Sequence, residues 1–179
     1  MDETGIPAGV KGFTHTPPAG WSVDNSNMGT GGVTEWAGWA FATDEFWSQA
    51  QRDQWRELNV RSRDVFAVAD SDERDDKSHT GTFDSTLITP KWAVTGGSTR
   101  NLTFQTHYRQ ESGQSAQVLV SYNGGAPTVV KSYTADADAV AKAESLALQV
   151  PAGATDVQIR FRYSGNNNWY WTVDNVRLS

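Results

Sequence analysis

A regular alternation of bulky and polar side chains in the second half of the chain limits the fold most strongly. Between residues 156 and 163 every second side chain is apolar or aromatic, as in a strand with one buried face. Such half-buried strands must pack against a second layer, which predicts a sandwich or a barrel. Further strand-like segments lie at residues 102–109, 117–122, 128–133, 145–150 and 169–178.

The first half of the chain is less regular. The continuous apolar run at residues 65–69 predicts a strand buried on both faces. Residues 44–58 predict one short helix, because acidic residues stand at its start and tryptophans recur at roughly helical spacing. We expect a polar loop at residues 70–81 and a helical turn in the Ala- and Asp-rich segment 136–143.

These segments predict an all-β fold, a two-sheet antiparallel β-sandwich of the jelly-roll type with one short helix near residues 44–58. A chain of 179 residues is long enough to bury one substantial core. We expect a single domain at residues 12–179 after a loose lead-in at residues 1–11. The dipeptide Asn123-Gly124 predicts a hairpin turn, because both residues accept positive φ.

Charge and composition argue against several classes of partner. The formal net charge is −6 and the pI is about 5.0, so we expect no nucleic-acid partner. The chain has no cysteine, which excludes disulfides, thiolate metal sites and cysteine nucleophiles, and which favours a secreted, extracellular protein. No apolar run approaches the roughly 20 residues of a membrane span, so we expect no membrane partner.

Five carboxylates crowd into residues 70–76. Crowded anions repel one another unless a cation or an arginine neutralises them, and Ca²⁺ takes about six to eight oxygen ligands. The spacing is not that of an EF-hand, so the segment is either a calcium site or a solvated acidic loop paired with Arg74 and Lys77. A carboxylate among the apolar residues of the last strand also needs a metal, an arginine or solvent. The candidate metal ligands are Asp70, Asp72, Asp75, Asp84 and Asp174.

Motifs of a catalytic site are absent from the sequence. The chain has no Gly-x-Ser-x-Gly elbow and no glycine-rich phosphate loop before Lys-Ser/Thr, and its three histidines lack zinc-type spacing. A carboxylate pair for glycoside hydrolysis stays open, because 21 Asp and Glu always offer some suitable pair. We therefore expect no enzymatic activity.

The run Asn-Asn-Asn-Trp-Tyr-Trp at residues 166–171 is typical of a sugar-binding surface. An exposed ring stacks on the apolar face of a pyranose, while neighbouring amides bond its hydroxyls. The alternative is that Trp169 and Trp171 belong to the core and that Tyr170 is an ordinary surface residue. The candidate ligand-binding residues are Asn167, Asn168, Trp169, Tyr170, Tyr108 and Arg109.

The sequence also resembles the MAM-like jelly-roll superfamily, in particular the choice-of-anchor and cleaved-adhesin type modules of bacterial secreted proteins. The resemblance rests on residues 18–23, 67–72, 83–90 and 171–178. Residues 35–47, together with the acidic loop, resemble modules attached to actinobacterial secreted metallophosphoesterases.

This resemblance implies a two-sheet jelly roll with structural Ca²⁺ that adheres to proteins or glycans or accompanies an enzyme. By position, Asp174 matches a closing-motif Asp that contacts Ca²⁺, and Asp70, Asp72 and Asp84 match the acidic loop of the family. Related carbohydrate-binding jelly rolls supply a Glu from the first strand, and residues 13–15 contain none.

Three functions therefore stand as hypotheses, because a fold does not settle a function. The first is a non-catalytic accessory module that binds a polysaccharide or another glycan and contains structural Ca²⁺. The second is a protein-interaction or adhesion module that packs on a parent enzyme domain. The third is a small polysaccharide lyase or hydrolase.

Overall fold

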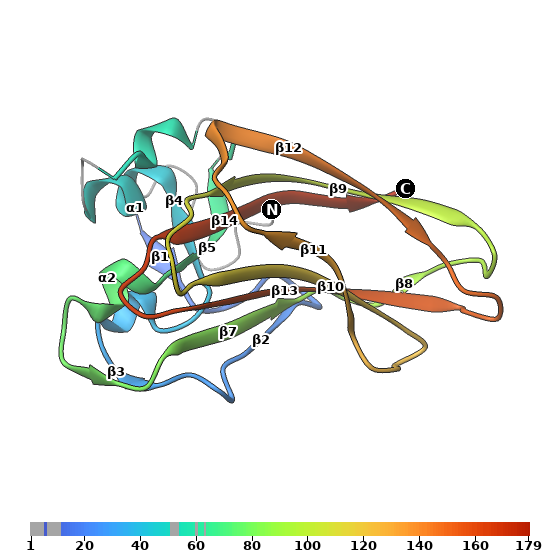
Figure 1. Ribbon diagram of the computed structural model, residues 1–179, viewed down its shortest axis with the longest axis horizontal. Helices are drawn as coiled ribbons and strands as arrows, with labels where there is room; N and C mark the ends of the chain where they lie inside the picture. The colour runs from blue at the N-terminus through green and yellow to red at the C-terminus, as the bar shows by residue number, and fades with distance from the viewer. Residues whose placement is uncertain (1–5, 7–11, 51–53, 60, 63) are drawn as a thin grey trace.

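The structure is an all-β sandwich of two antiparallel sheets, which confirms the predicted fold class (Figure 1). The predicted lead-in lies outside the described residues except for Ile6, which is buried against the core. No helix in the described part of the chain is long and apolar enough to cross a membrane. This computed structural model describes residues 6, 12–50, 54–59, 61–62 and 64–179.

The first sheet has six strands, and each is antiparallel to its neighbours. β14 is the last strand in the sequence, yet it lies between β5 and β9 in the middle of this sheet. In spatial order the strands are β1 (Phe13–Thr14), β4 (Ala40–Thr43), β5 (Val65–Asp70), β14 (Tyr170–Leu178), β9 (Thr99–Tyr108) and β12 (Ala137–Gln149).

The second sheet is also antiparallel, and the short strand β8 (Trp92–Ala93) pairs with the first two residues of its interior strand β13 (Asp156–Gly165). The predicted turn at Asn123 and Gly124 is confirmed, with φ of 51° and 72° between β10 and β11. A separate pair is formed by β3 (Thr30–Gly31) and β6 (His79–Thr80). In spatial order the second sheet contains β11 (Thr128–Tyr133), β10 (Ser115–Tyr122), β13 (Asp156–Gly165), β7 (Phe83–Ile88) and β2 (Ser22–Asp24).

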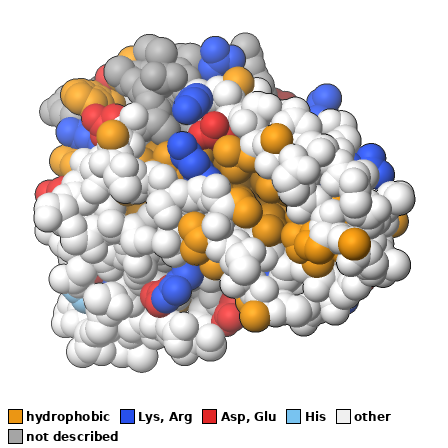
Figure 2. Space-filling model, turned by 45° about the vertical axis from the view of Figure 1, so that its right-hand side comes forward, with side chains coloured by type: hydrophobic (Ala, Val, Ile, Leu, Met, Phe, Trp, Pro, Cys, Tyr) orange, Lys and Arg blue, Asp and Glu red, His pale blue; other side chains and the backbone are white. Residues whose placement is uncertain are grey.

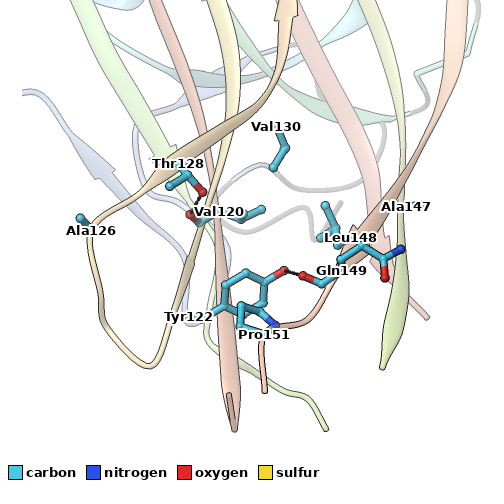
Figure 3. Close-up of a pocket in the computed structure, with 9 residues that line it drawn as sticks. All are labelled: Val120, Tyr122, Ala126, Thr128, Val130, Ala147, Leu148, Gln149 and Pro151. Carbon is cyan, nitrogen blue, oxygen red and sulfur yellow. Dashed lines mark hydrogen bonds between the residues drawn. The ribbon is translucent and has the colours of Figure 1, made fainter. Parts of the chain in front are cut away.

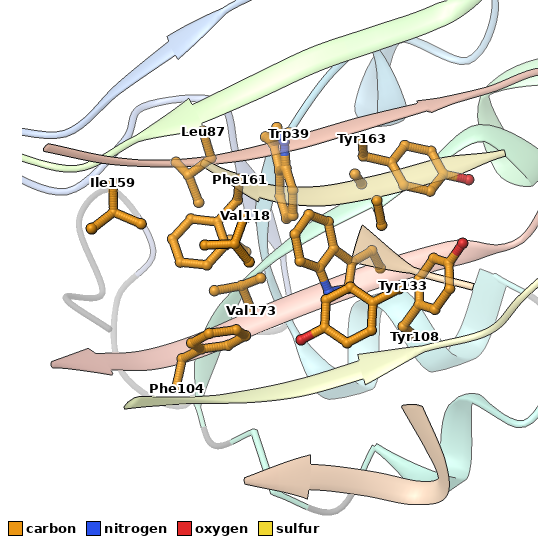
Figure 4. Packing of buried hydrophobic residues seen from close by; sticks show 14 of the residues in the cluster. Trp39, Leu87, Phe104, Tyr108, Val118, Tyr133, Ile159, Phe161, Tyr163 and Val173 are labelled. Carbon is orange, nitrogen blue, oxygen red and sulfur yellow. The ribbon is translucent and has the colours of Figure 1, made fainter. Parts of the chain in front are cut away.

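The main core lies between the two sheets and is built by the alternating side chains that the sequence predicts. The inward side chains of β13 are at most 1% exposed. In Figure 4 they meet side chains of the first sheet, and the ring of Phe161 lies edge-on to Phe104 with centroids 5.2 Å apart. Burial of each such side chain contributes roughly 1.5–3 kcal/mol, so this interdigitation holds the sheets together.

A second apolar cluster lies on the outer face of the first sheet. There α1 (Asp44–Ala50) and η2 (Arg56–Leu58), together called the helical cover, pack near β4 and β5, preceded by η1 (Thr34–Trp36). β5 therefore packs on the main core with one face and on this cluster with the other, which confirms the predicted strand buried on both faces. The cluster contains Trp36, Ala40, Ala42, Trp47, Phe66, Val68 and Tyr170.

The predicted single helix at residues 44–58 is shorter in the structure. α1 ends at Ala50, residues 51–53 lie outside the described part, and η2 is a separate 3-10 turn. Trp55 lies between them with a φ of 63°, a left-handed conformation that a continuous α-helix does not contain. Helical spacing in the sequence does not reveal such a break.

Two segments that were expected to be irregular have regular structure. The predicted helical turn at residues 136–143 is wrong, because the segment belongs mostly to β12 and pairing with β9 overrides the helix propensity of its alanines. The predicted polar loop at residues 70–81 contains α2 (Ser71–Asp75) and β6. Asp70 caps α2, because its Oδ1 accepts a hydrogen bond from the Glu73 amide at 3.1 Å.

Candidate functional site

Asp70, a predicted metal ligand, lies fully buried at the end of β5 beneath the helical cover. Its Oδ2 accepts a 2.8 Å hydrogen bond from Trp47 Nε1 and forms a 3.1 Å ion pair with Arg56 Nη2. Its Oδ1 is engaged with the Glu73 amide. Both oxygens of this carboxylate therefore already have protein partners.

Arg56 connects Asp70 to a second buried carboxylate. Its Nη2 lies 2.6 Å from Glu73 Oε1, and its guanidinium packs over the rings of Trp47 and Tyr170 at 5.0 and 5.6 Å. Burial, with smaller contributions from nearby carboxylates and against the attraction of Arg56, raises the pKa of Glu73 to about 7. We call Arg56, Asp70 and Glu73 the buried ion cluster. One cation here serves two carboxylates.

Asp75 and Asp84 each bind a different arginine. Asp75 Oδ1 lies 2.8 Å from Arg74 Nη1, and its Oδ2 accepts a 2.5 Å hydrogen bond from the Asn167 amide. Asp84 stands on the outer face of the second sheet, where Arg162 donates to both of its oxygens at 2.9 and 2.7 Å.

The two remaining candidate metal ligands lie in other surroundings. Asp72 accepts a hydrogen bond from the Gln54 side-chain amide, and burial raises the pKa of Asp72. Asp174 is fully buried in β14 and accepts hydrogen bonds from the amide and side chain of Asn175 at 2.7 and 3.1 Å. Over the described residues, no group of three or more His, Asp or Glu is placed to hold a metal ion. Calcium binding stays a prediction.

Three of the candidate ligand-binding residues are buried. Tyr170 does not lie at the surface: its hydroxyl donates to the Gln54 carbonyl at 2.6 Å, and its ring stacks on His107. Tyr108 is fully buried in the main core, and Asn168 is 7% exposed. Asn168 Nδ2 donates to Glu111 Oε2 and to the Ser112 carbonyl, both at 3.2 Å. These residues hold the strand ends in place.

Arg109, another candidate residue, contacts both the candidate Trp169 and an aromatic ring that sequence reasoning did not select. The Arg109 guanidinium lies 3.5 Å from the ring centroid of Trp169 and 4.6 Å from that of Trp55. Trp55 is 41% exposed. We call Trp55, Arg109 and Trp169 the indole stack. Asn167, from the same candidate set, is exposed in the loop before Trp169. Helical spacing had placed Trp55 in a helix, and its left-handed backbone explains the error.

A groove between the edge strands β11 and β12 was also missed by sequence reasoning. Hydrophobic side chains gather in a hollow on one face of the molecule (Figure 2), and the groove has a volume of about 480 Å³. Figure 3 shows that both sheets line it and that the Tyr122 hydroxyl donates across it to the Gln149 carbonyl at 3.4 Å. The lining residues are Val120, Tyr122, Ala126, Thr128, Val130, Ala147, Leu148, Gln149 and Pro151.

Comparisons with known proteins show the fold. No protein-family model and no curated protein matches the sequence. TmCBM61, solved in complex with β-1,4-galactotriose, is similar with a TM-score of 0.56 and 14% identity over 90% of this chain and 88% of that one. A cleaved adhesin domain of Lys-gingipain from Porphyromonas gingivalis has a TM-score of 0.55 and 19% identity over 96% and 98%.

A third similar structure is a cyclase from Fischerella sp., with a TM-score of 0.57 and 12% identity over 98% of this chain and 90% of that one. At such identities the likeness concerns the fold and not the function. The resemblance to cleaved-adhesin modules is thus confirmed for the fold. The chain therefore has the β-sandwich architecture found in one carbohydrate-binding module, an adhesin domain and a cyclase.

Proposed function

We propose that this chain is a non-catalytic accessory module of a secreted protein and that it binds a carbohydrate chain at the indole stack. The exposed ring of Trp55, backed by Arg109 and Trp169, is the observation that carries the proposal. A ring held in place by a stacked cation loses little conformational entropy when a ligand binds. More of the contact energy between the ring and a pyranose therefore appears as binding affinity.

Two further observations support a binding role without catalysis. The fold is similar to that of TmCBM61, which was solved with a bound galactotriose. Burial moves the pKa of Glu73 to about 7 and that of His107 to about 4, yet these side chains are only 6% and 1% exposed. Both acid–base groups lie beneath the helical cover, away from a surface that a polysaccharide reaches.

The test is affinity electrophoresis and calorimetry of the whole chain against β-1,4-galactan, xylan, mixed-linkage β-glucan and galactomannan. We expect binding to at least one glycan and a loss of about tenfold or more in affinity for Trp55→Ala, because exposed aromatic anchors carry most of the energy of small interfaces. Val129→Ala is the matched control, since it removes an exposed apolar side chain from β11. Reducing-end release is measured in parallel.

The outcomes separate the hypotheses. Binding that is equally strong for Trp55→Ala and the wild type would place the glycan site elsewhere. Absence of binding across the panel would count against a carbohydrate ligand, and release of reducing ends would show an enzyme.

A protein-binding or adhesion role is the second candidate, and the edge strand β11 favours it. Val129 and Val130 are 48% and 39% exposed on this strand, and an unpaired strand edge is a template for another polypeptide. This role predicts that Val129→Lys abolishes binding to a neighbouring enzyme domain, whereas Trp55→Ala leaves it intact.

A further inference from the structure

The resemblance to jelly-roll modules implies a structural Ca²⁺, and the positions of the predicted ligands test whether this chain can hold it. One Ca²⁺ needs its oxygen ligands within about 2.6 Å of a single point. Asp70 lies outside the first sheet beside Trp47, whereas Asp84 lies outside the second sheet beside Arg162. Because the sandwich separates these two carboxylates, they cannot bind the same ion.

Three of the predicted metal ligands form ion pairs with arginines instead. Asp70 pairs with Arg56, Asp75 with Arg74, and Asp84 with Arg162. We propose that these three arginines replace a structural cation, so that the fold forms and stays stable without a bound divalent metal. Arg162 and Asp84 are 78 residues apart in the sequence, so the pair joins two strands.

Arg74 is the clearest example of an arginine in the place of a structural cation, because it is fully buried. Segments distant in the sequence pack around it. Its carbonyl accepts a 2.8 Å hydrogen bond from the Val33 amide. The neighbouring amides of Gly29 and Gly32 donate to the carbonyls of Thr82 and Ser78 at 2.8 and 2.9 Å. The loop before η1 and the segment after α2 are thus held against each other around this side chain.

The glycines of this loop make room for the arginine. A Cβ at Gly29 would clash with the Thr80 carbonyl oxygen and lie 2.8 Å from Arg74 Nη2, and a Cβ at Gly32 would lie 2.7 Å from both Cγ and the carbonyl oxygen of Arg74. Gly29 does not have a positive φ, so its lack of a side chain is explained by space alone. Gly29 and Gly32 therefore fit closely against both the Arg74 side chain and the neighbouring backbone.

The same arginine opposes a metal ion at Asp75. Its Nε and Nη2 have no hydrogen-bond partner among the described residues, and its Nη1 lies 2.8 Å from Asp75 Oδ1, which is also 3.4 Å from His79 Nε2. A divalent cation at Asp75 would be repelled by the guanidinium at close range and in a poorly hydrated site.

The first experiment is thermal unfolding of the whole chain in 5 mM CaCl₂ and in 5 mM EDTA. A Ca²⁺ site at roughly a thousandfold excess over its Kd would raise the Tm by on the order of 10 °C for a chain of this size. We expect the two Tm values to agree within about 1 °C. A rise in Ca²⁺ or a fall in EDTA of several degrees would overturn the proposal and establish the calcium site that the sequence predicts.

The second experiment replaces the arginines. We expect Arg74→Met to lower the Tm by on the order of 10 °C, because it leaves Asp75 buried without its cation, and Arg74→Lys to lower it less. Arg177→Met, at an exposed position, is the matched control and should change the Tm by less than about 2 °C. An unchanged Tm in Arg74→Met would overturn the proposal. If Arg74→Met does not fold, Arg74→Lys and the calcium comparison decide.

Discussion

The outer face of the first sheet has two regions that differ in what covers them. Near β4 and β5 the helical cover buries aromatic rings and the buried ion cluster. Further along, β9, β12 and the end of β14 form a hollow of about 500 Å³ lined mainly by small and polar side chains. β9 passes from one region to the other, because Thr103 and Gln105 line the hollow while His107, on the same face, is 1% exposed.

This difference shows how one sheet can carry both a second core and a solvated face. Where the outer side chains are Phe66, Val68 and Tyr170, burying them offsets the ordering of a helical segment above them. Where the outer side chains are the polar Thr103 and Gln105, covering them would bury little apolar surface and would not offset the cost of ordering a helical segment. The ionised groups under the cover are tolerated because Arg56 meets two carboxylates at once.

The largest expected effect comes from removing the cation under the cover. Arg56→Met should lower the free energy of unfolding by about 3–5 kcal/mol, because it leaves Asp70 and Glu73 buried without their shared partner. Urea denaturation monitored by tryptophan fluorescence measures the change. A loss below about 1 kcal/mol would show that the cover is held by its apolar contacts alone.

A smaller effect concerns the pH dependence of stability under the cover. The pKa of Glu73 rises from 4.5 to about 7 on folding, so between these pH values the folded protein keeps a proton that the unfolded chain has lost. Stability from this group is therefore present below pH 4.5 and is lost as pH rises to 7, by at most about 3 kcal/mol. Glu73→Gln should remove this decline in urea titrations from pH 4 to 8.

His107 makes stability depend on pH in the opposite direction to Glu73. Burial lowers the pKa of His107 from 6.5 to about 4, so the unfolded chain takes up a proton first as pH falls. Its contribution is present above pH 6.5 and is lost as pH falls towards 4. In the wild type the two contributions oppose each other between about pH 4.5 and 6.5. His107→Gln should therefore steepen the decline of stability with rising pH, and parallel pH profiles for the two variants would contradict both assignments.

The smallest effect is expected in the hollow. Gln105→Ala and Thr103→Ala should each change the free energy of unfolding by less than about 0.5 kcal/mol, because neither side chain supports a cover. Urea denaturation of these variants is measured beside Arg56→Met. A loss of 2 kcal/mol or more at either position would remove the distinction between the two regions.

The sequence predicted the strands better than the site, for a physical reason. The alternation of apolar and polar side chains along residues 156–163 is a local pattern, and it correctly predicted the buried face of β13. The continuous apolar run at residues 65–69 likewise predicted that both faces of β5 are buried. Pairing with β9 overrides local propensity in the first half of β12, and the left-handed backbone of Trp55 interrupts the expected helix. For these the sequence carries no local signal.

The site residues were harder to predict because their partners are distant in the sequence. Arg109 and Trp169 belong to the predicted ligand-binding set, whereas Trp55 comes close to Arg109 only in the folded chain. The acidic loop was predicted as either a calcium site or a solvated loop paired with Arg74 and Lys77. The structure confirms the pairing of Arg74, and it buries that residue. Arg56 and Arg162 reach their carboxylates from other elements, which spacing within the loop cannot reveal.

The central position of β14 has a consequence for how the molecule is made. A ribosome that has not yet released residues 170–178 holds a chain whose first sheet is two separate pieces, with β5 on one side and β9 on the other. Pairings between such distant segments form slowly and late. The first sheet is therefore completed only when residues 170–178 pair with both β5 and β9, and a chain without this segment leaves the two halves of the sheet unjoined.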